Sequence, residues 1–403
     1  MSVFAGNKLR WAGGAVLVVV AAGLSGIVTM FTLPNVLPGV ERGRLADAPI
    51  ATSAAARSAA AAIALVEDQE PATLDMAERL ATAAVMDDPL DVSAIRTLSF
   101  VQAYRGNAEQ AMRLLRYGES LSRRDLMTEL ALGLDAQQTA GDAAAIRHYG
   151  HALSTTRRGY DLIVTQVLEA SQDLAFARAL GAAMADRPIW RDRFLPTFVG
   201  RSENPEALTA MAQGMWSKGV PVADRGTAAA VTSRLLRLGA ADDAATLIGM
   251  IRGKDARLVQ NGDFEETDSR ALGWRYESGA SLSALPVPDE EGRGRVLEVH
   301  AGSGHLGSVA RQMLALTPGQ YRLSARLSAN AEADAGMPRV TIGCASADDE
   351  LADLRRSETG ERVAMSFAVP EDCPVQFLDV VFGSSMFVTD SRGRVDDIAI
   401  EAN

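Results

Sequence analysis

The stretch Leu258–Gly279, "LVQNGDFEETDSRALGWRYESG", marks the place where the character of the sequence changes. Before it, the chain is rich in alanine and spaces its apolar residues as helices do; after it, short segments alternate apolar and polar residues. Asn261-Gly262 is a turn signal, and Phe264 follows at a position suited to a buried core. We therefore expect this stretch to form the first strand and first loop of a β-domain, and it could alternatively hold a ligand.

Six segments after this stretch have the alternating pattern of half-buried strands. They are residues 295–300, 321–329, 339–343, 362–369, 375–382 and 395–402. Turn residues separate them, for example "TPGQ" at 317–320 and "DSRGR" at 390–394. This pattern predicts an antiparallel β-sandwich, or jelly roll, over residues 256–403.

Four motifs in a fixed order add a resemblance to a known family. They are "NGDFE" (261–265), "GW" (273–274), "LTPGQYRLSARL" (316–327) and "VDDIAI" (395–400). Together they resemble the carbohydrate-binding-module, or galactose-binding-like, jelly roll. The resemblance implies a structural calcium near the paired first and last strands. The matching positions are Glu265 and Asp397, with Asp263 and Asp396 nearby. Because calcium takes six to eight oxygens, backbone carbonyls would have to complete the site; the alternative is a set of solvated turn carboxylates.

The same resemblance implies sugar binding, which requires exposed aromatic faces together with polar groups. The aromatic residues expected in the core are Phe264, Tyr321, Phe367 and Phe377. The candidate ligand-binding residues are Trp274, Tyr276 and Phe387, with Phe382 as a further candidate. For Trp274, a packing role in the core is the favoured alternative.

The chain has two cysteines, Cys344 and Cys373, and both lie in strand-like segments of the C-terminal third. If this domain lies outside the membrane, an oxidising environment favours a disulfide between them. The alternative is two buried free thiols.

Residues 51–253 have the composition and apolar spacing of helices. Between residues 88 and 125, Gly106-Asn107 marks a turn, and the helix after it is lined by Ala111, Leu115 and Gly118. Shifts of 34 residues from these three positions lead to Ala145, Tyr149 and Ala152 in one direction, and to Ala77, Ala81 and Ala84 in the other. This period resembles the tetratricopeptide repeat and implies a repeat-like α-solenoid with a surface for protein partners. A helical spacer without a partner is the alternative.

The N-terminus predicts a membrane anchor. Residues 11–33 contain no charge, and as a helix they would cover about 34 Å, enough for a bilayer core of about 30 Å. We expect residues 1–10 to form a cytoplasmic tail, 34–50 a linker, and the rest of the chain to lie on the periplasmic side of the inner membrane. A cleaved signal peptide is the alternative, although the nearest small-x-small site, Ala46-Asp47-Ala48, lies far beyond the apolar run.

The charge of the chain argues against a nucleic-acid partner. The formal net charge is −11, and residues 256–403 contain 24 Asp and Glu against 14 Lys and Arg. The G-x-G-x-x-G string at 302–307 lacks the strand-to-helix context of a dinucleotide site. His148 and His151 lie three residues apart, but no third metal ligand has suitable spacing nearby, so a surface or packing role is expected.

These features predict a protein with helices followed by a β-sandwich: an N-terminal transmembrane helix, a tetratricopeptide-repeat-like α-solenoid and a C-terminal jelly roll. We expect a non-catalytic envelope scaffold that binds proteins through its helices and polysaccharide through the sandwich, in surface or exopolysaccharide assembly or export. Two alternatives are a protein scaffold without sugar binding and a carbohydrate-active enzyme that uses paired carboxylates on the sandwich.

Overall fold

The computed structural model describes residues 53–67, 69–157, 159–252, 257–266, 272–290, 292, 294–329, 337–347, 349–355, 361–386 and 390–403. The predicted tail, membrane-spanning segment and linker, residues 1–50, lie outside this set. Within the described ranges, no helix combines the length and the apolar character needed to cross a bilayer. The chain divides into two compact units, and the division falls between Ile163 and Val164.

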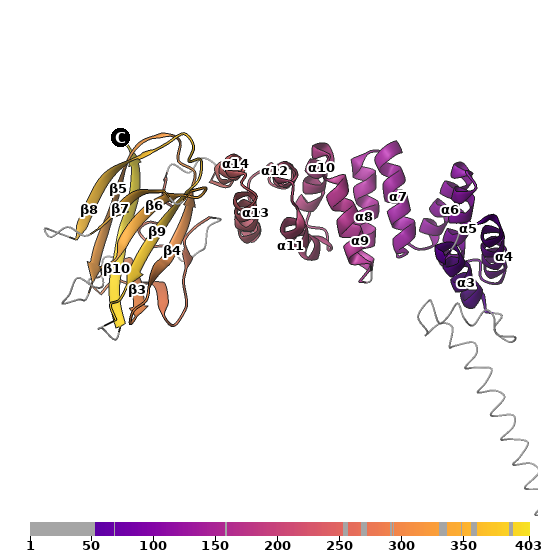
Figure 1. The fold of residues 1–403 in the computed structure, drawn as a ribbon, viewed down its shortest axis with the longest axis horizontal. Helices are drawn as coiled ribbons and strands as arrows, with labels where there is room; N and C mark the ends of the chain where they lie inside the picture. Colours follow the sequence, from indigo (N-terminus) through magenta and orange to yellow (C-terminus); the bar gives the residue numbers. More distant parts are fainter. Residues whose placement is uncertain are drawn as a thin grey trace, which may run out of the picture. The chain divides into compact units, whose positions relative to one another are not determined.

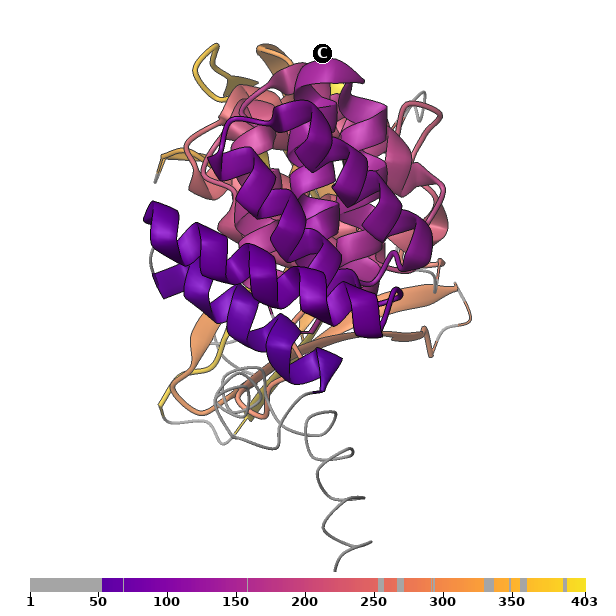
Figure 2. The same cartoon turned by 90° about the vertical axis from the view of Figure 1, so that its right-hand side faces the viewer.

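The first unit is helical, as the composition predicts. Its helices are α3 (Ala54–Glu67), α4 (Pro71–Asp87), α5 (Val92–Tyr104), α6 (Ala108–Leu121), α7 (Leu126–Thr139), α8 (Asp142–Thr155) and the first turn of α9 (Tyr160–Ala170). Consecutive helices pack as the pairs α3–α4, α5–α6 and α7–α8, and Figure 2 shows the first two pairs in indigo.

The 34-residue spacing seen in the sequence corresponds to buried positions in the second helix of each pair. Ala77 on α4, Ala111 on α6 and Ala145 on α8 are each no more than 4% exposed. Gly106 and Gly141, which lie in the turns, have φ angles of 82° and 85°, a region in which glycine is strongly favoured. The expected pairing of helices is therefore present, whereas membership of the tetratricopeptide-repeat family stays a prediction.

The second unit begins with helices and ends with the sandwich. Its helices are α10 (Leu174–Ala185), α11 (Arg191–Arg201), α12 (Pro205–Met215), the short 3₁₀ turn η2 (Val222–Asp224), α13 (Arg225–Arg237) and α14 (Ala241–Arg252). Helices α10 and α12 meet at two glycines: a Cβ at Gly181 would lie 1.9 Å from Met211 O, and one at Gly214 would lie 2.1 Å from Arg178 O. The guanidinium of Arg252 joins α14 to the sandwich by donating to Leu258 O and Met313 O, both at 2.8 Å.

The sandwich consists of two antiparallel five-stranded sheets (Figure 1). One sheet has the order β1-β4-β9-β6-β7 and the other β2-β3-β10-β5-β8. The strands are β1 (Arg275–Tyr276), β2 (Leu282–Pro288), β3 (Arg295–Gly302), β4 (Leu306–Leu314), β5 (Gly319–Ala329), β6 (Arg339–Cys344), β7 (Glu350–Leu354), β8 (Arg362–Val369), β9 (Gln376–Gly383) and β10 (Asp390–Ala402). From β3 to β6 the chain alternates between the sheets, as in a jelly roll.

The six segments of alternating pattern are strands, namely β3, β5, β6, β8, β9 and β10. The expectation of a first strand beginning at Leu258 is wrong, because residues 258–263 form turns and the first strand is the short β1 at Arg275–Tyr276. The predicted turn at 390–394 is wrong, because these residues extend β10 and pair with β3. The polar and glycine residues of this segment are typical of a turn, but they alternate in burial as in a strand. Ser391 and Gly393 are buried, while Arg392 is exposed. Gly393 lies against the Phe382 ring, where a Cβ would come within 3.1 Å of the ring.

The "NGDF" turn closes the sandwich against its last strand. Ile398 N donates to Gly262 O at 2.9 Å, next to the register shift in β10 between Asp396 and Ala399. The Asn261 side chain stabilises the turn, because it donates to Glu266 O at 2.9 Å and accepts from Glu266 N at 2.8 Å. Phe264 is fully buried, with its ring centroid 5.6 Å from that of Trp274.

The predicted disulfide between Cys344 and Cys373 is confirmed. Cys344 ends β6, and Cys373 lies in the connection from β8 to β9, so the bridge joins one sheet to the loop that leads in from the other. Both cysteines are buried.

Removal of this disulfide is expected to destabilise the sandwich by about 3 kcal/mol. The cysteines are 29 residues apart, and opening a loop of that size increases the entropy of the unfolded chain. The Cys344→Ser/Cys373→Ser double variant should unfold at lower urea concentration than the wild type. A reducing agent should lower the midpoint of the wild type only, and equal midpoints for oxidised and reduced wild type would contradict the prediction.

Candidate functional site

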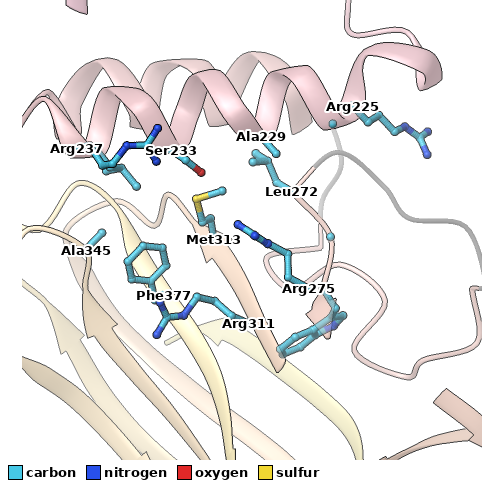
Figure 3. Close-up of a pocket in the computed structure, with 14 residues that line it drawn as sticks. Arg225, Ala229, Ser233, Arg237, Leu272, Arg275, Arg311, Met313, Ala345 and Phe377 are labelled. Atoms are coloured by element: carbon cyan, nitrogen blue, oxygen red, sulfur yellow. The ribbon is translucent and has the colours of Figure 1, made fainter. Parts of the chain in front are cut away.

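A cavity of about 450 Å³ lies between α13 and the face of the β1-β4-β9-β6-β7 sheet, all within the second unit. Figure 3 shows α13 along one wall, with Ala229, Ser233 and Arg237 on the side of the strands, and Arg225 at the end of the cavity. The strands and the segment before β1 supply the other wall, which is formed by Leu272, Trp274, Arg275, Arg311, Met313, Ala345 and Phe377. The cavity is therefore built from a helix and a sheet that are distant in sequence.

Four arginines surround this cavity, two from α13 and two from the sheet, and no carboxylate is among the described residues that line it. Arg275 on β1 and Arg311 on β4 are direct partners in the antiparallel register. Like charges placed opposite each other on neighbouring strands repel and are destabilising. Such a pair is favoured when an anion binds between or beside the two guanidinium groups.

One arginine of the pair is held by its neighbours. Arg311 Nε donates to Asp379 Oδ1 at 2.7 Å, and its guanidinium carbon lies 4.5 Å from the centroid of the Phe377 ring. Ser308 also hydrogen-bonds to Asp379, so this carboxylate is fixed from two sides. These contacts orient Arg311 and leave its terminal nitrogens for a ligand.

The apolar part of the cavity lies beside these charges. Met313 and Phe377 are cross-strand partners on β4 and β9. Phe377, which we predicted in the core, is only partly buried and lies on the cavity side of its sheet (Figure 3). An apolar surface next to planar cations suits a ligand with both hydrocarbon faces and negative groups.

The predicted aromatic ligand residues lie in different places. Trp274 is 7% exposed, donates from Nε1 to Asn261 O at 3.1 Å, and contributes to the cavity wall. Tyr276 is half-buried against the core, and its burial raises the pKa of its hydroxyl to about 12. Phe387 lies outside the described residues. Phe382 is fully buried, so its ring faces are not available to a ligand.

The four carboxylates proposed for calcium are engaged by protein groups. Asp397 Oδ2 accepts from Arg326 at 2.6 Å and from Arg362 at 2.7 Å. Glu265 Oε1 accepts from Arg295 N at 2.7 Å. The Asp263 carboxylate lies 3.5 Å from the Arg257 guanidinium.

The pKa of the Asp396 carboxyl is raised. Burial raises the pKa of its carboxyl to about 6, against the opposing hydrogen bond that its Oδ1 accepts from Asp397 N at 2.8 Å. Across the described part of the chain, three or more His, Cys, Asp or Glu ligand atoms gather within 4.8 Å at one place, and that place is in the first unit. In the described part of the sandwich, arginine side chains contact Asp263, Asp396 and Asp397, whereas Glu265 accepts from a backbone N–H.

Sequence reasoning did not find the arginine-lined cavity. Its arginines come from α13, β1 and β4, and no motif connects positions so far apart. The local signal in the sequence is Trp274-Arg275, an aromatic residue next to a cation, and both residues line the cavity.

No protein-family model matches this chain, and no curated protein does. Among solved structures, the sandwich region is similar to TmCBM61 in complex with β-1,4-galactotriose, with 13% identity over 37% of this chain and 100% of that chain and a TM-score of 0.27. A structure described as CBM4 has 15% identity over 36% of this chain and 99% of that chain, with a TM-score of 0.26.

A third similar structure is the enzymatically active domain of tailspike protein 4 from bacteriophage CBA120. It has 13% identity over 36% of this chain, with a TM-score of 0.27, and the match spans only 21% of the tailspike chain. Likenesses of this size carry no conclusion about the ligand or activity of the present protein.

Proposed function

We propose that this chain is a non-catalytic binding protein whose second unit binds an acidic saccharide between α13 and the β1-β4-β9-β6-β7 sheet. The proposal rests on one observation: four arginines line a single cavity that also has an apolar wall. They are Arg225, Arg237, Arg275 and Arg311. Guanidinium groups bind carboxylates, sulfates and phosphates in planar, often bidentate, pairs. A sugar ring supplies hydrocarbon faces for the apolar side.

The positive charge of the cavity contrasts with the negative charge of the chain. The protein has a net charge of −11, and its last third is strongly acidic, yet the described lining of the cavity contains four arginines and no acid. A neutral sugar does not require this concentration of cations. An acidic sugar suits it, because its negative groups can pair with the guanidinium groups of the cavity, of which Arg311 already contacts one carboxylate, Asp379.

The rest of the proposed function follows from the sequence. We propose that the helical first unit binds a protein partner and that residues 11–33 anchor the chain in the inner membrane with its bulk on the periplasmic side. Together with the sandwich, these parts suit a scaffold in assembly or export of an acidic surface polysaccharide. The support is the helical pairing in the first unit, the apolar run in the sequence and the disulfide in the sandwich.

Arg275→Ala and Arg237→Ala are each expected to weaken binding of an acidic oligosaccharide by at least about tenfold. Each removes one charge-assisted contact, and such contacts contribute roughly 1.5–3 kcal/mol. The full-length chain should first be tested on a glycan array that pairs uronic-acid-containing oligosaccharides with neutral ones of equal length. The variants should then be compared by calorimetry on the best acidic ligand.

The matched control is Arg322→Ala, which removes one exposed arginine from β5 on the other sheet. It should bind as the wild type does, and added salt should weaken binding of the wild type. If only neutral glycans bind, the acidic-saccharide proposal is wrong. If no glycan binds, the interpretation as a protein scaffold without sugar binding gains support.

A further inference from the structure

Helices α6, α7 and α8 of the first unit bring two histidines and two glutamates together. Glu119 lies on α6, Glu129 on α7, and His148 and His151 on α8. One ligand atom from each side chain lies within 4.8 Å of the others. In the sequence, His148 and His151 lie three residues apart without a third metal ligand at suitable spacing. The fold places two carboxylates, from Glu119 and Glu129, beside them.

Glu129 is at the centre of this cluster. Its Oε2 lies 2.9 Å from His148 Nδ1 and 3.3 Å from His151 Nδ1. The third contact joins His148 Nδ1 to Glu119 Oε1, at 3.7 Å. In a tetrahedral site with metal–ligand bonds of about 2.0–2.2 Å, ligand atoms are separated by roughly 3.3–3.6 Å. The spacing in this cluster is therefore close to that of a metal-binding set.

The burial of Glu129 is a second, independent observation. Its side chain is 0% exposed, and its Oε1 is buried without a hydrogen-bond partner in the structure. Its Oε2 contacts the two imidazoles, and neither imidazole is a fixed cation. A buried carboxylate is costly unless a positive charge compensates it, and a divalent cation would supply that charge.

We propose that Glu119, Glu129, His148 and His151 bind one divalent transition-metal ion, with Zn²⁺ as the expected occupant. Two imidazole nitrogens and two carboxylate oxygens form a ligand set that suits zinc, whereas calcium prefers oxygen ligands alone. Because the ligands come from three consecutive helices, the ion joins α6 and α7 to α8. The site then has a structural role in the surface proposed for protein binding.

The ion can reach the site from solvent. The side chains of His151 and Glu119 are 34% and 23% exposed, whereas Glu129 lies beneath them. This arrangement gives a closed inner side and an accessible outer side, which a site that exchanges metal requires.

The test uses the full-length chain, produced without a histidine tag and stripped of metal with a chelator. Titration with Zn²⁺ is expected to show one equivalent bound per chain, and Zn²⁺ should raise the melting temperature of the helical unit. Co²⁺ should give the visible absorption of a four-coordinate ion with nitrogen and oxygen ligands. His148→Ala and His151→Ala should each weaken Zn²⁺ binding by at least about tenfold, because each removes one of four ligands.

The control is His305→Ala, which removes an exposed histidine of the sandwich whose Nδ1 lies 3.0 Å from Ser303 O. It should bind Zn²⁺ as the wild type does. Far-ultraviolet circular dichroism should show that the variants at 148 and 151 keep their helices, since both side chains are only partly buried. Absence of stoichiometric Zn²⁺ binding, or binding retained in the His148→Ala/His151→Ala double variant, would establish a hydrogen-bonded Glu–His cluster without metal and overturn the proposal.

Discussion

Gly262→Ala is expected to destabilise the β-sandwich by about 3 kcal/mol or more, because a methyl group at this position has no room. A Cβ at Gly262 would lie 1.9 Å from Ile398 O and 3.0 Å from Ile398 C. The obstacle is backbone on the last strand, which cannot rotate away as a side chain can. The backbone hydrogen bond from Ile398 N to Gly262 O, 2.9 Å long, would have to lengthen or break.

Hydrogen exchange resolved by peptide is the measurement that best checks this effect, since the chain contains two units. Amides of β10 should exchange much faster in Gly262→Ala than in the wild type, while those of the first unit should not change. The matched control is Gly302→Ala on β3, where the nearest atoms to a new Cβ lie at 3.7–3.9 Å, which is ordinary contact. Equal exchange of β10 in both variants would show that the 261–265 turn is not what closes the sandwich.

Asp224→Ala should have an effect of similar size on the helices of the second unit, about 3–5 kcal/mol. Asp224 Oδ2 lies 2.6 Å from Arg191 Nη2 and accepts from Trp216 Nε1 at 3.1 Å. The side chain of Arg191 is 2% exposed, and its Nε and Nη1 are buried without hydrogen-bond partners. Removal of the carboxylate therefore leaves a buried guanidinium without its compensating charge.

The pH dependence of this effect has a definite sign. Burial alone would raise the pKa of Asp224, but the hydrogen bonds from Arg191 and Trp216 hold it below its ordinary value of 3.8. Because the folded pKa lies below the unfolded one, the stabilisation is present above the unfolded pKa and is lost as pH falls through the folded pKa. Wild type and Asp224→Ala should differ strongly in urea midpoint at pH 7 and converge below pH 3.8.

Asp192→Ala is the control for this second prediction. Asp192 is an exposed acid in the first turn of α11, where a negative charge interacts favourably with the helix dipole. Its removal should cost only about 0.5 kcal/mol. A similar midpoint for Asp224→Ala and Asp192→Ala at pH 7 would show that Arg191 finds another partner when Asp224 is absent.

The sandwich was predictable because its strands alternate apolar and polar residues. Its first turn, at Asn261-Gly262, also carries the residues that the contact with the last strand requires. Asn261 and Gly262 are a turn signal in the sequence, and in the structure one braces the turn while the other admits the backbone of β10. The two cysteines pair as predicted, since Cys344 ends β6 and Cys373 lies shortly before β9, the neighbour of β6 in its sheet. The strand at 390–394 was missed because its polar residues look like a turn when their cross-strand partners are unknown.

The sites were less predictable, for a physical reason. The sequence drew attention to Trp274 and to the four carboxylates near the first and last strands. The fold buries the ring of Trp274, and it pairs Asp397 with Arg326 and Arg362. Local sequence shows which groups are present, but not which opposite charges meet them.

By itself, the sequence predicted helices followed by a sandwich, six of the sandwich strands, the helix pairing, the turn at Asn261-Gly262 and the disulfide. These features depend on residue periodicity, on glycine in tight turns and on the only two cysteines of the chain. Only the tertiary structure decided which arginines surround one cavity and which carboxylates meet His148 and His151. Both sites consist of side chains from three or more separate elements, and their chemistry exists only after packing has fixed the distances between them.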